Sequence, residues 1–333
     1  MNHDNISSNK RRLAIFYEHP EWFKPLFAEL DKRGVNYDRL LAYEHRFNPG
    51  DHHYCPYALV VNRMSPSAYM RGHAETIFYT LEYLAYLKET GANVLNGYDA
   101  YVYEFSKARQ LRLLEYLGLR YPRAQVINHP SQALAAADGL TFPVVVKPNI
   151  GGSGAKIVRF NTPDELRAST QTGTIDLGID HTALVQEYLP AEGDSIVRVE
   201  FLNGAYLYAI RLFLTSGEFN LCPADYCPVS RPGQQSNAGG LEDNVSGRDK
   251  MVEGYTPTAQ VIEDVKRITT AAHIEVGGVE YLVNARDGQI YYYDINVMSN
   301  FVADAPQVIG FDPFPLLVDY LLIRAGLGEP ETV

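Results

Sequence analysis

Short apolar segments alternate with amphipathic segments over the first hundred residues, and this alternation constrains the fold most strongly. Strands are expected at 13–17, 35–42, 58–61 and 94–95, and helices at 22–33 and 74–89. In the second helix the apolar stripe consists of Ile77, Phe78, Leu81, Leu84 and Ala85. Strands that alternate with helices predict a parallel sheet covered on both faces. We therefore expect a small doubly wound α/β domain over residues 12–105 (the first domain), after a flexible polar lead at 1–11.

Composition and local motifs exclude several classes of protein. Residues 18–21, after the first strand, read Glu-His-Pro-Glu, so the glycine motif of a dinucleotide site is missing. A net charge of -11 disfavours sequence-independent nucleic-acid binding. No apolar run is long enough to span a membrane. Because three cysteines, Cys55, Cys222 and Cys227, cannot form a disulfide framework, we expect a cytoplasmic protein with free thiols.

A second α/β (α+β) unit is expected over residues 106–326, with Ser106 as the N-cap of its first helix. Strands are predicted at 123–127, 143–147, 156–160 and 183–187, and hairpins at 196–214 and 276–294. N-caps or capping boxes are predicted at 162–165, 256–257 and 312–313. The unit divides into two lobes, 106–190 (the first lobe) and 191–326 (the second lobe).

Residues 216–255 are rich in Gly, Pro, Asn and Gln and are expected to be irregular. A loop of this length inside a compact chain is usually functional or disordered. The functional interpretation is a lid that excludes water from a reactive intermediate. The alternative is a disordered insertion without a catalytic part.

A strand, a glycine-rich loop and a second strand follow one another at residues 144–158. Lys147 ends the first strand, and the loop contains Gly151, Gly152, Ser153 and Gly154. Glycines let backbone N–H groups approach an anion, and a lysine supplies a point charge for phosphate. The loop is not a Walker A motif, because a strand follows it instead of a helix. A flexible hairpin with a surface lysine is the alternative.

The segment Gln186-Glu187-Tyr188-Leu189-Pro190 ends a strand and opens into a linker. Its carboxylate and its free backbone groups are able to contact an adenine edge. A solvated strand terminus is the alternative.

Glu280, Asp294 and Asn296 lie on the two strands of the predicted second hairpin. Asp294 and Asn296 are two residues apart and therefore point to one face. Buried carboxylates need partners, and the two strands offer no Lys or Arg except Arg286 at the turn. Carboxylate and amide oxygens suit Mg²⁺, so we interpret these residues as metal ligands. A salt-bridged pair with a structural Asn is the alternative.

Taken in order, these motifs resemble the ATP-grasp superfamily. The segments that carry the resemblance are Ser106-Lys107, VVVKP (144–148), the glycine loop, QEYL (186–189), GDSIVRV (193–199) and the GGVEYLV…YYYDIN hairpin. The fold implied is a small pre-ATP-grasp domain followed by a two-lobed ATP-grasp domain. The family usually has Glu-x-Asn where this chain has Asp294-Ile295-Asn296.

The resemblance implies how ATP would be held. Lys107, Lys147 and the glycine loop would contact its phosphates. Glu187, Tyr188 and Leu189 would hold the adenine, and Asp194 would lie on the ribose or phosphate side. Arg198 and Arg211, on adjacent strands, would face the γ-phosphate and an acyl phosphate. Glu280, Asp294 and Asn296 would bind two Mg²⁺, with Mn²⁺ as an alternative.

Within the superfamily the chain looks most like the α-L-glutamate ligase and lysine-biosynthesis ligase branch, and more distantly like glutathione synthetase. This resemblance is carried by residues 60–72, 93–119 and 236–240. It implies an ATP-dependent ligase that joins an amino-acid or peptide carboxylate to an amine through an acyl phosphate. Arg63, Asn237 and Asn300 are its candidate substrate contacts, and a homo-oligomer is compatible with it.

Two other functions remain open at this point. One is a catalytically silent ATP-binding module with a regulatory role. The other is a D-alanine–D-alanine-type ligase or a phosphotransferase of the same fold.

Overall fold

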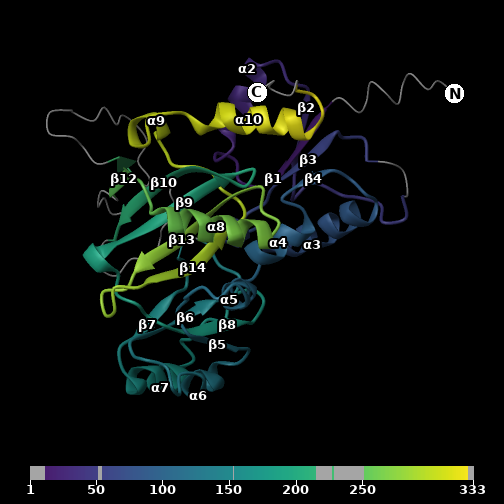
Figure 1. Cartoon of the computed structure of the whole chain (residues 1–333). Helices are drawn as coiled ribbons and strands as arrows, with labels where there is room; N and C mark the ends of the chain where they lie inside the picture. Colours follow the sequence, from purple (N-terminus) through teal and green to yellow (C-terminus); the bar gives the residue numbers. More distant parts are fainter. Residues whose placement is uncertain (1–11, 52–54, 153, 215–226, 229–250, 329–333) are drawn as a thin grey trace, which may run out of the picture.

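The computed structural model describes residues 12–51, 55–152, 154–214, 227–228 and 251–328. The predicted lead at 1–11 and most of the predicted lid, including Cys222, lie outside the described residues. The described part contains a four-stranded, a six-stranded and another four-stranded sheet. Figure 1 shows the first domain in purple and blue, the six-stranded sheet in the centre, and the first lobe below it.

The first domain is a parallel sheet with the strand order β2-β1-β3-β4. Its elements are β1 (Leu13–Tyr17), α2 (Lys24–Lys32), β2 (Tyr37–Leu41), β3 (Leu59–Arg63), a 3-10 turn η1 (Pro66–Arg71), α3 (Ala74–Glu89), β4 (Val94–Leu95) and α4 (Tyr98–Glu104). The predicted strands and the two predicted helices are confirmed. Helix α4 was not predicted, because its seven residues, YDAYVYE, form no clear apolar stripe.

Alternate residues of β1 face two different helix layers, as expected for a doubly wound sheet. Leu13 and Ile15 pack with Leu26 of α2 and with the C-terminal helix α10 (Pro313–Arg324). Ala14 and Phe16 point to the other face, which α3 and α4 cover.

The first lobe is an antiparallel sheet with the strand order β5-β8-β6-β7. Its elements are α5 (Lys107–Tyr116), β5 (Ala124–Ile127), η2 (Pro130–Gln132), α6 (Ala133–Ala136), β6 (Val144–Pro148), β7 (Val158–Phe160), α7 (Pro163–Thr172) and β8 (Ala183–Glu187). Helices α6 and α7 cover one face, at the bottom of Figure 1. Helix α5 instead packs on the central sheet.

The central, six-stranded sheet has the order β11-β12-β10-β9-β13-β14. The second lobe contains η3 (Glu192–Asp194), β9 (Ser195–Leu202), β10 (Ala205–Phe213), β11 (Cys227–Pro228), β12 (Met251–Tyr255), α8 (Ala259–Ala271), β13 (Val276–Val283), β14 (Ile290–Asn296), α9 (Ala305–Val308) and α10. Both predicted hairpins are confirmed. None of the described helices is both long and apolar enough to cross a membrane.

Three local predictions need correction. The stretch 216–255 is not irregular to its end, because Met251–Tyr255 forms β12 along the edge of β10. Thr258, not Thr256, caps α8, and its hydroxyl accepts from the Val261 N–H. Thr162 caps α7 as predicted, but the Glu165 carboxylate accepts from the Asn161 N–H rather than from the cap residue.

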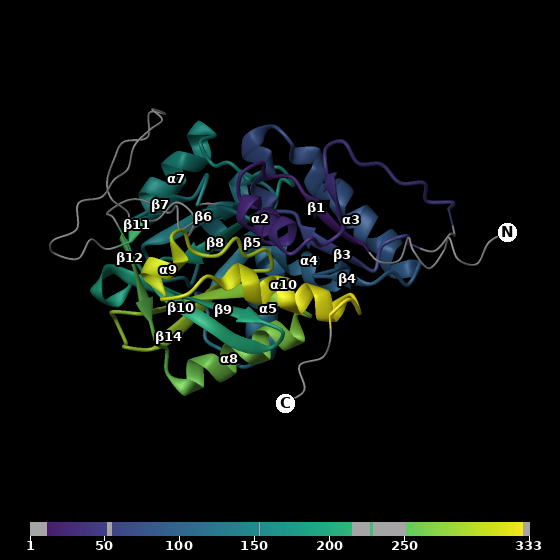
Figure 2. The same cartoon turned by 90° about the horizontal axis from the view of Figure 1, so that it is seen from above.

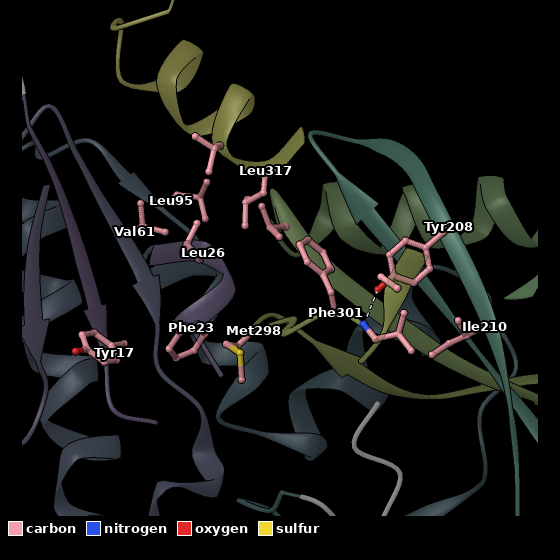
Figure 3. Close-up of a cluster of buried hydrophobic side chains, with 14 of the residues drawn as sticks. Tyr17, Phe23, Leu26, Val61, Leu95, Tyr208, Ile210, Met298, Phe301 and Leu317 are labelled. Atoms are coloured by element: carbon pink, nitrogen blue, oxygen red, sulfur yellow. Dashed lines mark hydrogen bonds between the residues drawn. The ribbon is translucent and has the colours of Figure 1, made fainter. Parts of the chain in front are cut away.

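The C-terminal helix α10 packs between α2 of the first domain and β10 of the central sheet. Its residues Leu317 and Leu321 share one apolar cluster with Leu26 of α2 and Ile210 of β10. Figure 2 shows α10 between the first domain and the central sheet, and Figure 3 shows the cluster around Leu317. In Figure 3 the Tyr208 hydroxyl accepts a hydrogen bond from the Val302 N–H at 3.1 Å. The first domain is therefore not covered by its own helices alone.

Asn96, which follows β4, fastens the first domain to the central sheet. Its amide donates to the carbonyls of Val276 (2.6 Å) and Val297 (2.7 Å) and accepts from the Glu275 N–H (2.8 Å). The side chain is buried, and its φ of 50° lies in the left-handed region that Asn tolerates. The Val276 N–H also donates to Asn96 Oδ1 at 3.4 Å, so one side chain satisfies four backbone groups of another domain.

Replacing Asn96 with Gly should lower the free energy of unfolding by about 2–4 kcal/mol, because it leaves buried backbone groups unpaired. Because glycine also adopts the positive φ, the decrease in the free energy of unfolding measures the lost side-chain hydrogen bonds and not backbone strain. Asn203→Gly is the matched control, since Asn203 has a φ of 53° at an exposed hairpin turn. It should change the unfolding free energy by less than about 0.5 kcal/mol. Equal urea unfolding curves for the two variants would contradict the assignment.

Candidate active site

A pocket of about 640 Å³ lies where the first domain and the two lobes meet, and this is the usual size of a ligand site. Trp22 and Ser67 contribute from the first domain, Lys147 and Gln186 from the first lobe, and Glu280 from the second lobe. All three parts of the chain are therefore needed to build it.

The pairing of β6 with β8 decides which side chains of the first lobe enter the pocket. Val145 pairs with Gln186, and both point into the pocket with Lys147. Val146 and Val185 point to the other face, where α6 and α7 pack. The period of two of the strands thus places one lysine and one carboxamide on the pocket wall.

The strand end at 186–189 borders the pocket, and Glu187 is among the lining residues. The Glu187 carboxylate accepts from Arg123 (2.5 Å) and from the Thr141 N–H (2.8 Å), so it is already engaged. The Tyr188 N–H donates to the Pro143 carbonyl, and the Tyr188 ring lies against Arg159. Tyr188 and Leu189 still border the pocket.

Gln186 is one of the pocket residues to which the sequence pattern assigned no role. It is buried, and its Oε1 has no hydrogen-bond partner among the described residues. A buried acceptor without a partner is costly, which suits an amino group of a ligand. The alternation along β8 indicated it, because Gln186 and Glu187 must point to opposite faces.

Lys147 and Lys107 bring two positive charges into the pocket. Lys147 is only 5% exposed, and burial, with a smaller effect of Lys107, lowers the pKa of Lys147 to about 7. Lys107 lies in the first turn of α5, and its Nζ is 2.5 Å from Asp294 Oδ1. Burial alone would lower the pKa of Lys107, but the contact with Asp294 outweighs it and raises the pKa.

The glycine loop lies next to these lysines. A Cβ on Gly151 would lie 3.7 Å from Lys107 Cε, and one on Gly152 would lie 2.6 Å from Ser67 Cβ of the first domain. Gly152 therefore has no room for a side chain. Gly154, with a φ of 68°, also lines the pocket. Ser153 lies outside the described residues.

Glu280 and Asp294 face each other across β13 and β14, and a β-bulge places them there. Glu280 pairs with Asp294 and Tyr281 with Tyr292, so Tyr293 is the extra residue. Bulges are frequent next to active sites, because they re-aim side chains. Asn296 follows on the same side, with its Nδ2 3.4 Å from Glu280 Oε1.

The predicted metal ligands fit a hard cation. Burial and the charge of Asp294 raise the pKa of Glu280 to about 7, against the influence of Arg198. Burial also opposes ionisation of Asp294, but Lys107 and Lys147 outweigh it and lower the pKa of Asp294. A cation would relieve the repulsion between the carboxylates. The described residues hold no cluster of three or more His, Cys, Asp or Glu that could hold a metal ion by themselves.

The inference that the two carboxylates lack basic partners is wrong. The two carboxylates do have basic neighbours, which come from other elements. Lys107 contacts Asp294, and Arg198 Nη1 donates to Glu280 Oε1 at 3.3 Å. The metal interpretation now rests on the oxygen donors and on the repulsion between the carboxylates.

Arg198 lines the pocket, but Arg211 does not. A regular hairpin across Asn203-Gly204 would place the two arginines on one face. A bulge between Tyr206 and Tyr208 shifts the register by one, so that Arg198 pairs with Ile210, and Arg211 turns to the other face. There Arg211 contacts Glu253 and the ring of Tyr255. The prediction that both arginines face one ligand is therefore not supported by the structure.

The remaining candidates are distributed unevenly. Asp194 and Asn300 line the pocket. Arg63 does not line it, because its guanidinium is fully buried and donates to the Ser299 carbonyl. Asn237 lies outside the described residues.

Comparisons with known proteins agree with this geometry. Residues 105–222 match the model of the RimK-like ATP-grasp domain. The carbamoyl phosphate synthase large chain of Deinococcus radiodurans is 28% identical over 218 residues, which cover 63% of this chain and 19% of that one. A probable alpha-L-glutamate ligase of Teredinibacter turnerae is 26% identical over 147 residues, which cover 44% of this chain and 48% of that one. The matches thus span a fifth to a half of these relatives.

A solved structure is similar over nearly the whole length. The ATP-grasp ligase PsnB, complexed with a phosphomimetic variant of its minimal precursor, Mg and ADP, has a TM-score of 0.65 and 16% sequence identity. The alignment covers 95% of this chain and 99% of that one. This likeness establishes the fold.

The lowered pKa of Lys147 predicts a pH-dependent effect of Lys147→Met on stability. The unfolded lysine has a pKa of about 10.4, so from about pH 7 to 10 the unfolded chain binds more protons, and wild-type stability rises with pH. Lys147→Met should be more stable than the wild type at pH 7, and the difference should shrink towards pH 10. Lys266→Met, at an exposed position of α8, is the control and should show no such trend in urea unfolding. A constant difference for Lys147→Met would contradict the lowered pKa.

Proposed function

We propose that this chain, an ATP-grasp protein with a RimK-like domain, is an ATP-dependent ligase that joins a carboxylate to an amine. The observation that carries the proposal is one pocket in which two lysines lie opposite two facing carboxylates. This arrangement suits a polyphosphate held between lysines and metal-bound carboxylates.

The nucleotide would lie along the wall formed by β6 and β8. The partnerless Gln186 Oε1 suits the amino group of adenine, with Tyr188 and Leu189 beside it. Asp194 borders the same end and suits the ribose. Lys147, Lys107 and the glycine loop would then hold the phosphates.

Glu280, Asp294 and Asn296 would hold two Mg²⁺, or Mn²⁺ in their place. Bound metal would supply charge neutralisation for the polyphosphate. With Asp294 engaged in this way, Lys107 would be free to turn towards a phosphate.

The reaction follows from the poor leaving group of a carboxylate. A carboxylate oxygen attacks the γ-phosphorus, the bond to ADP breaks, and an acyl phosphate forms. The amine then attacks the acyl carbon, phosphate leaves, and the nitrogen loses a proton. Lys147 offsets the charge of the phosphoryl group, and Arg198 stabilises the tetrahedral oxyanion. No side-chain nucleophile is required.

Amino acids or peptides are the proposed substrates. The names of two similar proteins support this class, a probable alpha-L-glutamate ligase and a ligase complexed with its precursor. Trp22, Ser65 and Ser67 of the first domain, with Asn300, border the pocket where such a substrate would enter.

The test is a screen for ADP release from ATP and Mg²⁺ in the presence of amino acids and short peptides, added singly and in pairs. A ligase releases ADP only when a carboxylate and an amine are both present, and mass spectrometry should find the joined product. ADP release that no acid or amine stimulates would reject the ligase and favour the silent or phosphotransferase alternative.

Asp294→Asn should shift the Mg²⁺ dependence, because it removes one negative charge from the cation site. We expect the Mg²⁺ concentration for half-maximal ADP release to rise about tenfold or more, with partial rescue by Mn²⁺. Asp287→Asn, at the exposed turn of the same hairpin, is the control. If both variants give the wild-type Mg²⁺ titration, Asp294 is not a ligand.

Arg198→Ala and Arg211→Ala should differ sharply, although the residues lie on neighbouring strands. Loss of Arg198 should lower kcat by about 10²–10³-fold, as expected for a charge that stabilises the transition state. Arg211→Ala should stay within about threefold of wild type, because its side chain points away from the pocket. Steady-state kinetics decide, and a large loss for Arg211→Ala would contradict the assignment of faces.

A further inference from the structure

Glu200 is a completely buried carboxylate that the pocket does not use directly. It lies on β9 two residues after Arg198, is 0% exposed and does not line the pocket. Residues two apart on a strand share a face. A buried carboxylate is costly without a partner, so its presence behind the pocket needs an explanation.

The first observation is its contact with Arg198. Arg198 Nε donates to Glu200 Oε1 at 2.6 Å, and Arg198 Nη1 donates to Glu280 Oε1 at 3.3 Å. Nη2 has no hydrogen-bond partner among the described residues. Because a guanidinium is planar, two carboxylates on its other nitrogens fix the direction of Nη2.

The second observation is that the sheet makes room for this carboxylate. Glu200 pairs with Gly278 of β13. A Cβ on Gly278 would come within 2.9 Å of the Glu200 carboxyl carbon and of both its oxygens. Any larger residue at 278 would therefore displace the carboxylate from Arg198.

The third observation is a second buried cation. Burial lowers the pKa of Arg63 to about 10, while the charges of Glu200 and Glu104 act in the opposite direction. Arg63 ends β3 of the first domain. Glu200 thus forms an ion pair with Arg198 on its own strand and also acts electrostatically on Arg63 of the first domain, while its Oε2 has no hydrogen-bond partner among the described residues.

We propose that Glu200 is a positioning residue, which holds the Arg198 guanidinium so that Nη2 points at the γ-phosphate end of the pocket. This inference rests on the proposed binding of ATP. Glu200 touches neither nucleotide nor substrate and acts only through Arg198. A purely structural ion pair would contribute to stability without affecting the ligand.

The test compares the wild type with Glu200→Gln, which keeps the shape and removes the charge. Isothermal titration measures the dissociation constants of ADP and of a non-hydrolysable ATP analogue, each with Mg²⁺. The preference for the analogue is the dissociation constant of ADP divided by that of the analogue. In the variant this ratio should fall about tenfold, while the dissociation constant of ADP stays within about twofold of the wild-type value. The KM for ATP should rise by about the same factor, and the kcat for ADP release should fall as well.

A double-mutant cycle shows whether Glu200 acts through Arg198. Arg198→Lys keeps a positive charge beside Glu200, but the lysine ammonium lacks the planar guanidinium that Glu200 is proposed to orient. Adding Glu200→Gln to Arg198→Lys should change the preference for the analogue by less than about twofold. Full additivity would overturn the proposal.

Glu275→Gln is the matched control. Glu275 also forms an ion pair with an arginine, with 2.8 Å between Glu275 Oε2 and Arg324 Nε, but neither residue lines the pocket. It should lower the thermal midpoint without changing the preference for the analogue. If Glu200→Gln behaves like this control, Glu200 is only structural and the proposal is wrong. If the wild-type protein binds the analogue but releases no ADP with any acid and amine, the ligase function is rejected. The role of Glu200 is then still decided by comparing the binding of ADP and the analogue in wild type and variant.

Discussion

Charge compensation inside the pocket is the constraint on which the rest of the structure depends. Asp294 and Glu280 face each other with little solvent, and neither would stay ionised without the cations that other elements bring. Lys107 arrives from the start of α5, Arg198 from β9 and Lys147 from β6. The first lobe and the second lobe must therefore pack against each other before the pocket charges are balanced. Stability and the proposed binding of a polyphosphate depend on the same groups.

Two irregularities in the central sheet decide which charges meet. The bulge in β14 presents Asp294 opposite Glu280. The bulge in β10 turns Arg211 out of the pocket, whereas Arg198 on β9 lines it. In both cases a single extra residue changes the face to which the following side chains point. The composition of the pocket is thus a consequence of strand register as much as of residue type.

Two separate elements hold the first domain to this sheet, Asn96 through polar contacts and α10 through apolar contacts. Asn96 satisfies backbone groups at one end of β13 and β14, and α10 fills the space between α2 and β10. Gly152 of the first lobe touches Ser67 of the first domain at the mouth of the pocket. The pocket therefore lies at a junction of three parts of the chain, each of which contributes lining residues.

The sequence by itself determined the local elements and the family of motifs. Strand β8, helix α3 and the hairpin turns follow from alternation, helical stripes and turn residues, which are properties of neighbours along the chain. It also identified Lys107, Lys147, Glu280, Asp294 and Asn296, which the structure brings to one pocket. Only the tertiary structure decided that Lys107 pairs with Asp294, 187 residues away, that Gln186 rather than Glu187 offers its side chain, and that Arg211 lies outside. Register and long-range ion pairs depend on contacts between distant segments, and no local pattern encodes them.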